Sequence, residues 1–439
     1  MGAPTFHSGS RVSLYPLTVR QEDGDFIVGR IETGTFVSLP EVGVRALEIL
    51  REGETLHEAE AQLATEDGST VDLQAFAAEL LNLGFIATVD GDPAGSPTAA
   101  RNHLSWLQPM HVRWLFSRPA AAAFFIILAA ATVTLILHPD LLPVYNDYFW
   151  SPLPSLVIAG NLVLGTFHLV IHEFAHLVAA RAEGIPALIR WGTRLQYFVV
   201  QTDVSGAWAL PRFARYRIYL AGILWDLLAV SLLILASAYA GLPATGQALL
   251  AAWILLIFFG LVYQFSFYMR TDIYFVLLDL LHSRNLFQDA QRLLRHQYRR
   301  GLHRLLPNRG PLPPDPLLTL SASERRKVAF YAGLLITGTT ISLGCYLFFG
   351  ISILLQMVSQ AAGGLVTGLQ TRDAARLLDS GLALLAIVGT HALFVAAFFH
   401  SHRGAIASVF ATMARTITPH PALPSGPSQS EAPPPAVAP

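Results

Sequence analysis

Six long apolar runs constrain this chain more than any other feature of its sequence. Five of them carry no charged residue and are long enough to cross a hydrocarbon core of about 30 Å, and the sixth is interrupted by Asp226 alone. The runs cover residues 119–137, 152–171, 218–240, 247–269, 328–358 and 381–399. Of the 439 residues, 53% are hydrophobic and only 13% are charged, against about 25% charged in a soluble domain. We therefore predict a mainly α-helical, polytopic membrane protein of about six transmembrane helices.

The residues before the first run have a different character. Stretches 11–20, 25–31 and 34–40 are rich in β-branched and aromatic residues, and three helical patterns follow between 41 and 85. This order predicts a small α/β domain. The expected organisation is a cytoplasmic α/β domain, a linker with an interfacial segment, a membrane domain and a disordered Pro-rich tail, over 1–90, 91–118, 119–416 and 417–439.

The distribution of charge predicts the orientation of the runs. Residues 1–92 hold 16 acidic and 5 basic side chains, a net charge of −11, and the remaining 14 acids and 24 bases give +10. Ten bases lie within 282–327 and six within 181–217, whereas 138–151 has no Arg or Lys. The positive-inside rule then places both termini in the cytoplasm, with the second and fourth runs directed inward.

The second run continues into a motif whose side chains can bind a metal ion. His172, Glu173 and His176 form an H-E-x-x-H pattern, and residues four apart on a helix share one face, so both imidazoles can reach one ion beside Glu173. Zinc binds imidazole nitrogen, and catalytic zinc keeps one position open for water. Since ionisable groups inside an apolar span are costly and mark function, we interpret the motif as a hydrolytic zinc site. The alternative is a structural cluster of buried polar groups.

A third ligand must be a histidine or a carboxylate, because the single cysteine, Cys345, cannot build a Cys-based site. His168 lies eight residues before His176, about 12 Å along a helix axis, so we expect it to support a ligand or face the substrate, or simply to be packed and hydrogen-bonded. Asp272, at the inner end of the fourth run, is the best donor. Asp279 lies two turns later on the same face and competes with it. The alternative for either aspartate is a helix-end charge facing water.

With these residues identified, the chain resembles the site-2-protease family of intramembrane zinc metallopeptidases, in which H-E-x-x-H in one span is completed by an aspartate from a later span. The resemblance covers roughly 150–290, and 202–228 is similar to the segment after the motif helix in bacterial putative peptide zinc metallopeptidases. It implies a zinc metalloendopeptidase in a bacterial inner membrane that cleaves a peptide or transmembrane protein near the cytoplasmic face. It also implies three zinc ligands and a general base, which are His172, His176, Asp272 and, as the base, Glu173.

The sequence departs from that family at three places. The usual aspartate-glycine pair is Asp272 followed by Ile273. The small-Gly-Pro-x-x-Asn pattern of the third span begins with Ala221 and Gly222, but it has Ile223 in the place of the proline and Asp226 in the place of the asparagine. These changes concern how the Asp272 segment turns and whether Asp226 touches the substrate. No PDZ-like domain lies between the spans. The alternating segment 190–211 predicts a reentrant hairpin that offers strand pairing to a substrate.

The N-terminal domain resembles PqqD-like peptide-recognition domains, which are winged-helix-like and bind leader peptides as an added strand. The likeness rests on the order of elements over 11–90 and on residues 33–50. It implies capture of a peptide substrate, whereas a generic domain would only pack on the membrane part. Its acidity suits a basic peptide, or docking on the basic segment 282–327.

Two other classes of function remain open. Membrane di-iron oxidases also cluster histidines, and His400 and His402 lie at an inner span end. A non-proteolytic peptide-binding sensor or export partner would retain a metal for structure. The expected partners are a peptide or transmembrane substrate and membrane lipid, and no nucleic acid.

Overall fold

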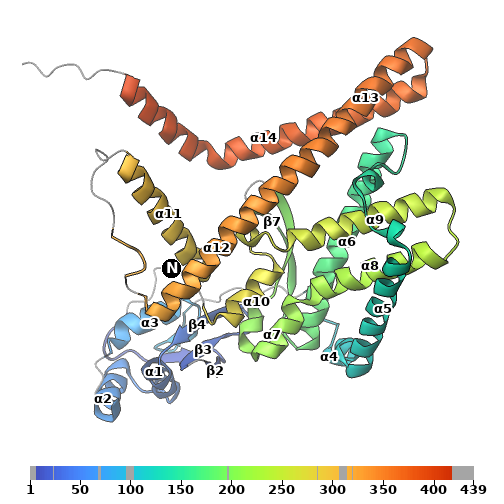
Figure 1. Cartoon of the computed structure of the whole chain (residues 1–439). Coiled ribbons are helices and arrows are strands. Elements are labelled where there is room, and N and C mark those ends of the chain that lie inside the picture. The colour runs from blue at the N-terminus through green and yellow to red at the C-terminus, as the bar shows by residue number, and fades with distance from the viewer. Residues whose placement is uncertain are drawn as a thin grey trace, which may run out of the picture. The chain divides into compact units, whose positions relative to one another are not determined.

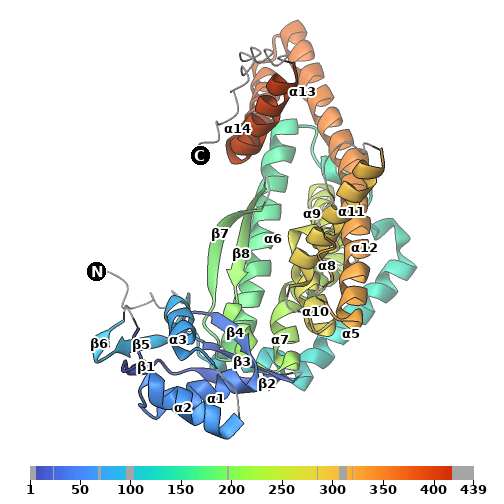
Figure 2. The same ribbon diagram turned by 90° about the vertical axis from the view of Figure 1, so that its left-hand side faces the viewer.

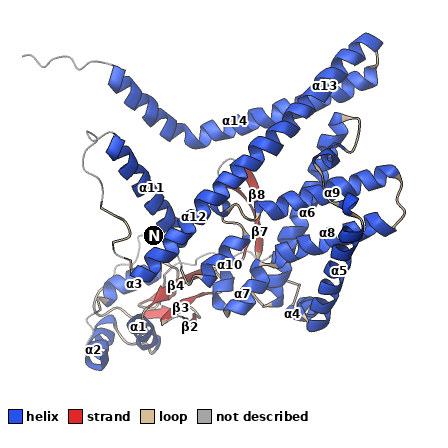
Figure 3. Cartoon of the chain, viewed as in Figure 1, coloured by secondary structure: helices blue, strands red, loops and turns tan. Residues whose placement is uncertain are grey.

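The computed structural model describes residues 6–22, 24–67, 71–94, 103–194, 197–283, 285–305, 314–318 and 320–417. The chain forms two units, of which one comprises 1–194 with 198–386 and the other 195–197 with 387–439. Residues 95–102 of the predicted linker and 418–439 of the predicted tail lie outside the described residues. The described chain is mostly helical, and its strands belong to the N-terminal region and to one hairpin (Figure 3).

The N-terminal region consists of two small antiparallel sheets packed with helices (Figure 1 and Figure 2). One sheet has the order β2-β3-β4 and the other β1-β5-β6. The strands are β1 (Val12–Leu14), β2 (Thr18–Glu22), β3 (Asp25–Arg30), β4 (Thr35–Leu39), β5 (Ile86–Val89) and β6 (Asp92–Pro93). The helices are α1 (Glu41–Arg51), α2 (Leu56–Asp67) and α3 (Leu73–Asn82).

One hydrophobic core joins these elements. Val28 from β3, Leu47 from α1 and Leu63 from α2 are almost completely buried in it, together with Phe85 just before β5. The predicted strands and helices of this region are present. Strands β5 and β6 were not predicted, because β5 is fixed by pairing with the distant β1, where Val12 lies opposite Val89.

Within the described residues, six helices are long and apolar enough to cross a membrane, as the hydropathy of the sequence predicted. The first four are α5 (Arg118–Leu137), α6 (Pro154–Ala182), α8 (Ala221–Tyr239) and α9 (Ala244–Tyr263). The fifth is one continuous helix made of α12 (Ala322–Cys345), the π-turn η6 (Tyr346–Gly350) and α13 (Ile351–Thr371). The sixth is the first part, Ala374–Ala397, of α14 (Ala374–Ile417). Helix α6 packs against both α8 and α9. The H-E-x-x-H motif therefore lies within a cluster of three such helices.

Two of the helix boundaries that differ from the apolar runs lie at the site. Helix α6 continues beyond residue 171 to Ala182, so the motif lies inside it. Helix α9 ends at Tyr263, several residues before the end of the fourth run. The chain turns there because Arg270 adopts a left-handed conformation, with φ of 52°, and the Thr271 hydroxyl donates a hydrogen bond of 2.5 Å to the carbonyl of Gln264. Apolar composition does not reveal such a turn.

Shorter elements connect the long helices and complete the site. A hairpin is formed by β7 (Leu188–Arg194) and β8 (Tyr197–Asp203), which run beside α6 (Figure 2), whereas the last part of the predicted segment 190–211 forms a 3₁₀ turn. The short helices are α4 (Pro109–Val112), α7 (Arg212–Tyr219) and α10 (Asp272–Leu280), and the polar helix α11 (Leu286–Leu305) is longer. The 3₁₀ turns are η1 (Arg113–Phe116), η2 (Pro139–Leu141), η3 (Tyr145–Phe149), η4 (Ser205–Ala209) and η5 (Phe267–Met269).

Candidate metal centre

Helix α6 presents two buried imidazoles toward the same point. His172 and His176 are 7% and 5% exposed, and their Nε2 atoms lie 3.3 Å apart. This follows from helix geometry, because residues four apart lie one above the other on a single face. The spacing that the motif predicted is therefore present.

Asp272 completes a triangle with the two histidines. Its Oδ2 atom lies 3.2 Å from Nε2 of His172 and 3.2 Å from Nε2 of His176. Ligand atoms about 2.0–2.1 Å from a tetrahedral zinc are about 3.3–3.4 Å apart, so the triangle has the dimensions of three corners of such a site. Within the described residues, this is the one group of three metal-ligating side chains that converge in this way.

Hydrogen bonds fix which ring nitrogen of each histidine faces the centre. Nδ1 of His176 donates to the carbonyl oxygen of Ile218 at 2.7 Å, and Nδ1 of His172 donates to the carboxylate of Asp226 at 3.0 Å. In a neutral imidazole, each Nε2 therefore carries a lone pair. Two lone pairs and a carboxylate oxygen repel one another at this separation, and one added proton can form a hydrogen bond between only one pair of these three atoms. A cation at the centre satisfies all three.

Asp226 and His168 lie behind His172. Asp226, on α8, is 2% exposed, and it also accepts a hydrogen bond of 2.8 Å from Nε2 of His168. A carboxylate that holds the far nitrogen of a ligating imidazole orients the ring and raises its basicity. The structure thus places both residues where they support His172, and His168 lies outside the triangle.

Asp279 lies apart from the triangle. It is 3% exposed, and its Oδ2 accepts a hydrogen bond of 2.7 Å from Nε of Arg215. It is neither one of the three converging ligands nor a helix-end charge facing water. Asp272 occupies the first turn of α10, where the free backbone N–H groups of the helix N-terminus favour a negative charge.

Two residues at the centre were not predicted as part of the site. Gln264 donates from Nε2 to Oδ2 of Asp272 at 3.0 Å and accepts from the Asp272 backbone N–H at 3.1 Å, so it fixes the carboxylate. A side chain at Gly222 would begin 2.4 Å from Nε2 of His172 and 2.5 Å from Nε2 of His176. The signal for Gln264 was an amide at the end of an apolar run, and the signal for Gly222 was its place in the small-Gly-Pro-x-x-Asn pattern of the third span.

Glu173 is half-buried and faces the hairpin. Its Oε2 accepts hydrogen bonds from the backbone N–H of Thr202 at 2.7 Å and from the Thr202 hydroxyl at 2.8 Å. Its other oxygen, Oε1, has no hydrogen-bond partner among the described residues. One carboxylate oxygen is thus fixed by β8, and the other remains able to bind water.

Comparisons with protein-family models, with curated proteins and with solved structures find no match to this chain. The interpretation of the site therefore rests on its own residues and geometry.

Proposed function

We propose that this chain is an intramembrane zinc metalloprotease of the site-2-protease type, which hydrolyses a peptide bond in a membrane-associated or leader-bearing peptide near the cytoplasmic face. The observation that carries the proposal is the triangle of His172, His176 and Asp272, which has zinc-site dimensions and lies beside a glutamate within a cluster of apolar helices. The arginine distribution supports an inner-membrane location with both termini in the cytoplasm.

The donor set fits zinc. Two imidazole nitrogens and one carboxylate oxygen are a common set for catalytic zinc, and three protein ligands leave one position for a small molecule. When bound, zinc supplies a Lewis acid that polarises a carbonyl and lowers the pKa of water. Gly222 leaves room at the triangle, because any side chain there would overlap both imidazoles.

Glu173 is the proposed general base. Its carboxylate takes a proton as the oxygen of water forms a bond to the carbonyl carbon of the peptide, and it returns that proton to the amine nitrogen as the C–N bond breaks. The two hydrogen bonds from Thr202 hold Oε2 in place, so Oε1 can accept a proton from water without rotation of the side chain. This preorganisation favours proton transfer, since a positioned base is more effective than a mobile one.

The hairpin supports capture of an extended substrate. Strands β7 and β8 pair with each other, and among the described residues neither pairs with a third strand. An outer edge of such a hairpin can form backbone hydrogen bonds with an added strand. Because Thr202 of β8 also holds Glu173, a peptide paired with this hairpin would lie near the base. We further propose that the PqqD-like N-terminal domain recruits the peptide.

The test combines metal analysis with peptide cleavage. Purified protein in liposomes is assayed with a quenched-fluorescent peptide library, as wild type, Glu173→Gln and Asp272→Ala. We expect one zinc per wild-type chain, zinc without turnover in Glu173→Gln, and loss of both in Asp272→Ala. Two irons per chain would favour an oxidase, and zinc without cleavage of any peptide would favour a sensor or export partner.

A further inference from the structure

A buried arginine joins the N-terminal domain to the two short helices beside the metal centre. Arg215, on α7, is completely buried. Its Nη2 and Nη1 donate to Glu22, at the end of β2, over 2.6 and 3.1 Å, and its Nε donates to Asp279, on α10, over 2.7 Å. One guanidinium thus connects three segments that are far apart in the sequence.

Further contacts reinforce this bridge. Nε of Arg212 donates to Glu22 at 2.8 Å, and the Arg215 guanidinium lies 4.9 Å from the centre of the Trp208 ring. The Glu22 side chain is only 11% exposed. The domain therefore docks on the basic segment 181–217, whereas the sequence suggested the basic segment 282–327.

Both helices that meet at Arg215 also hold parts of the metal centre. Ile218, which accepts the hydrogen bond from His176, lies three residues after Arg215 on α7. Asp272 lies two turns before Asp279 on α10. A short helix moves as a rigid rod, so a shift of α7 against α10 changes the position of Asp272 relative to the ring of His176.

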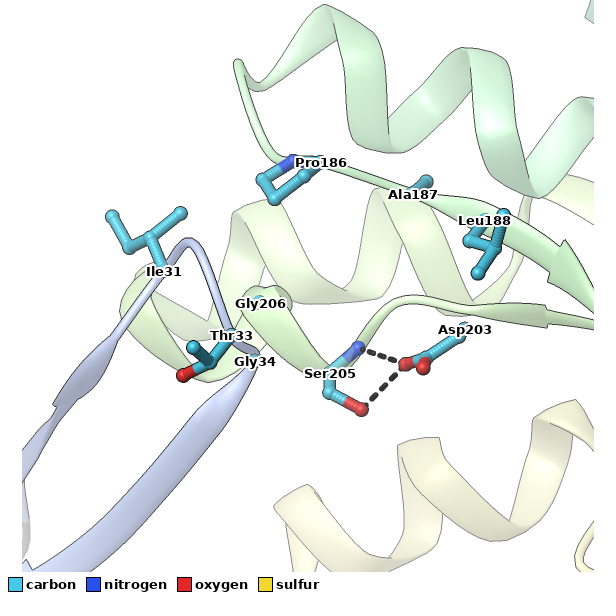
Figure 4. Close-up of a pocket in the computed structure, with 9 residues that line it drawn as sticks. All are labelled: Ile31, Thr33, Gly34, Pro186, Ala187, Leu188, Asp203, Ser205 and Gly206. Carbon is cyan, nitrogen blue, oxygen red and sulfur yellow. Dashed lines mark hydrogen bonds between the residues drawn. The ribbon is translucent and has the colours of Figure 1, made fainter. Parts of the chain in front are cut away.

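A second contact of the domain reaches the hairpin. The turn between β3 and β4 meets the end of β8 and η4 around a small pocket that includes Thr33, Gly34, Asp203 and Ser205 (Figure 4). Gly34 has φ of +68°, and a side chain added there would begin 3.0 Å from Cβ of Ser205. Thr202, which holds Glu173, lies directly before this contact. The domain thus touches the supports of both the metal ligands and the base.

We propose that docking of the N-terminal domain assembles the metal centre. The bridge Glu22–Arg215–Asp279 holds α7 and α10 in the arrangement that brings Asp272 to the two histidines, and release of the domain opens the triangle. Arg215 is then a positioning residue that acts through these helices. A peptide that displaces the end of β2 would reduce metal affinity at a distance. This inference rests on the proposed metal centre.

The experiment follows the metal itself in the full-length protein. Cobalt-loaded wild type, Glu22→Gln and Glu48→Gln are compared by visible absorption and by the rate of cobalt loss to a chelator. Glu48 is a matched control, because it lies on α1 of the same domain and pairs with Arg45 on an exposed face. We expect about tenfold faster cobalt loss and an altered spectrum in Glu22→Gln, with no change in Glu48→Gln.

A second variant breaks the bridge from its other end. Asp279→Asn leaves the domain unaltered and should give the same change in spectrum and in the rate of cobalt loss, so the inference stays testable if Glu22→Gln does not fold. Wild-type behaviour in both variants would overturn the inference and leave the metal centre intact. A wild-type protein that binds no cobalt or zinc would overturn the metal centre and this inference together.

Discussion

Nδ1 of His176 donates a hydrogen bond of 2.7 Å to the carbonyl oxygen of Ile218, across the contact between α6 and α7. A carbonyl oxygen only accepts, so Nδ1 carries a proton, and in the neutral imidazole the lone pair of Nε2 faces Asp272. His172 is oriented in the same way by Asp226. These two bonds turn both Nε2 atoms toward the centre of the triangle, where the proposed metal ion would bind.

Gly222 should be essential for metal binding. Gly222→Ala would place a methyl group within 2.5 Å of both Nε2 atoms, and we expect the zinc content to fall below about a tenth of the wild-type value. Gly165→Ala is the control, since nothing lies within 4 Å of a side chain added at that position of α6. Metal analysis that finds full zinc in Gly222→Ala would contradict the proposed location of the ion.

Asp226 should strengthen metal binding without touching the metal. Asp226→Asn removes the charge that holds Nδ1 of His172, and we expect zinc affinity to fall about 10- to 100-fold. His168→Gln should have a smaller effect, because His168 bonds to Asp226 and not to the triangle. Competition with a chromophoric chelator measures both affinities, and an equal loss in the two variants would assign His168 a larger role.

Thr202 should affect turnover and not metal content. Thr202→Val keeps the backbone hydrogen bond to Glu173 and removes the hydroxyl, which lies 2.8 Å from both Oε2 and the backbone carbonyl oxygen of Glu173. We expect kcat to fall about five- to tenfold, as for the loss of a hydrogen bond worth about 1 kcal/mol or slightly more. Thr339→Val, in α12, controls for the same substitution in an apolar helix. A fall in zinc content in Thr202→Val would show that the hairpin also supports the ligands.

The bridge from Glu22 to Arg215 should make the stability of the folded protein depend on pH in the acid range. Burial raises the pKa of the Glu22 carboxyl, but the hydrogen bond and charge of Arg215, with the charges of Arg20 and Arg212, outweigh it and hold the pKa below its usual 4.5. A lowered pKa means that ionised Glu22 contributes its full stabilisation above about pH 4.5, and that this is lost as the pH falls through the lowered value.

The matching measurement is the difference in unfolding temperature between metal-free wild type and Glu22→Gln. We expect this difference to be constant above about pH 4.5 and to shrink as the pH falls further. Asp279 behaves oppositely, because burial raises the pKa of its carboxyl despite the charge of Arg215. Asp279→Asn should therefore cost less stability at pH 5 than Glu22→Gln does. A difference that grows on acidification would refute the role given to Glu22.

Local patterns explain what could be predicted. The six long helices follow from apolar composition, because a backbone in hydrocarbon must satisfy its own hydrogen bonds. The pairing of His172 with His176 follows from helix periodicity. The approach of Asp272 was expected from membrane topology, but its position on a separate short helix was not, since the turn depends on Arg270 and Thr271.

The sequence by itself determined the elements whose causes lie within one segment, namely the apolar helices, the strands of the N-terminal sheet β2-β3-β4 and the motif on α6. Only the tertiary structure decided which carboxylate joins the histidines, and it assigned Asp226 to support, Asp279 to Arg215 and Gly222 to the space beside the imidazoles. The physical reason is that a contact between distant segments depends on how helices pack, and neither composition nor spacing along the chain records that packing.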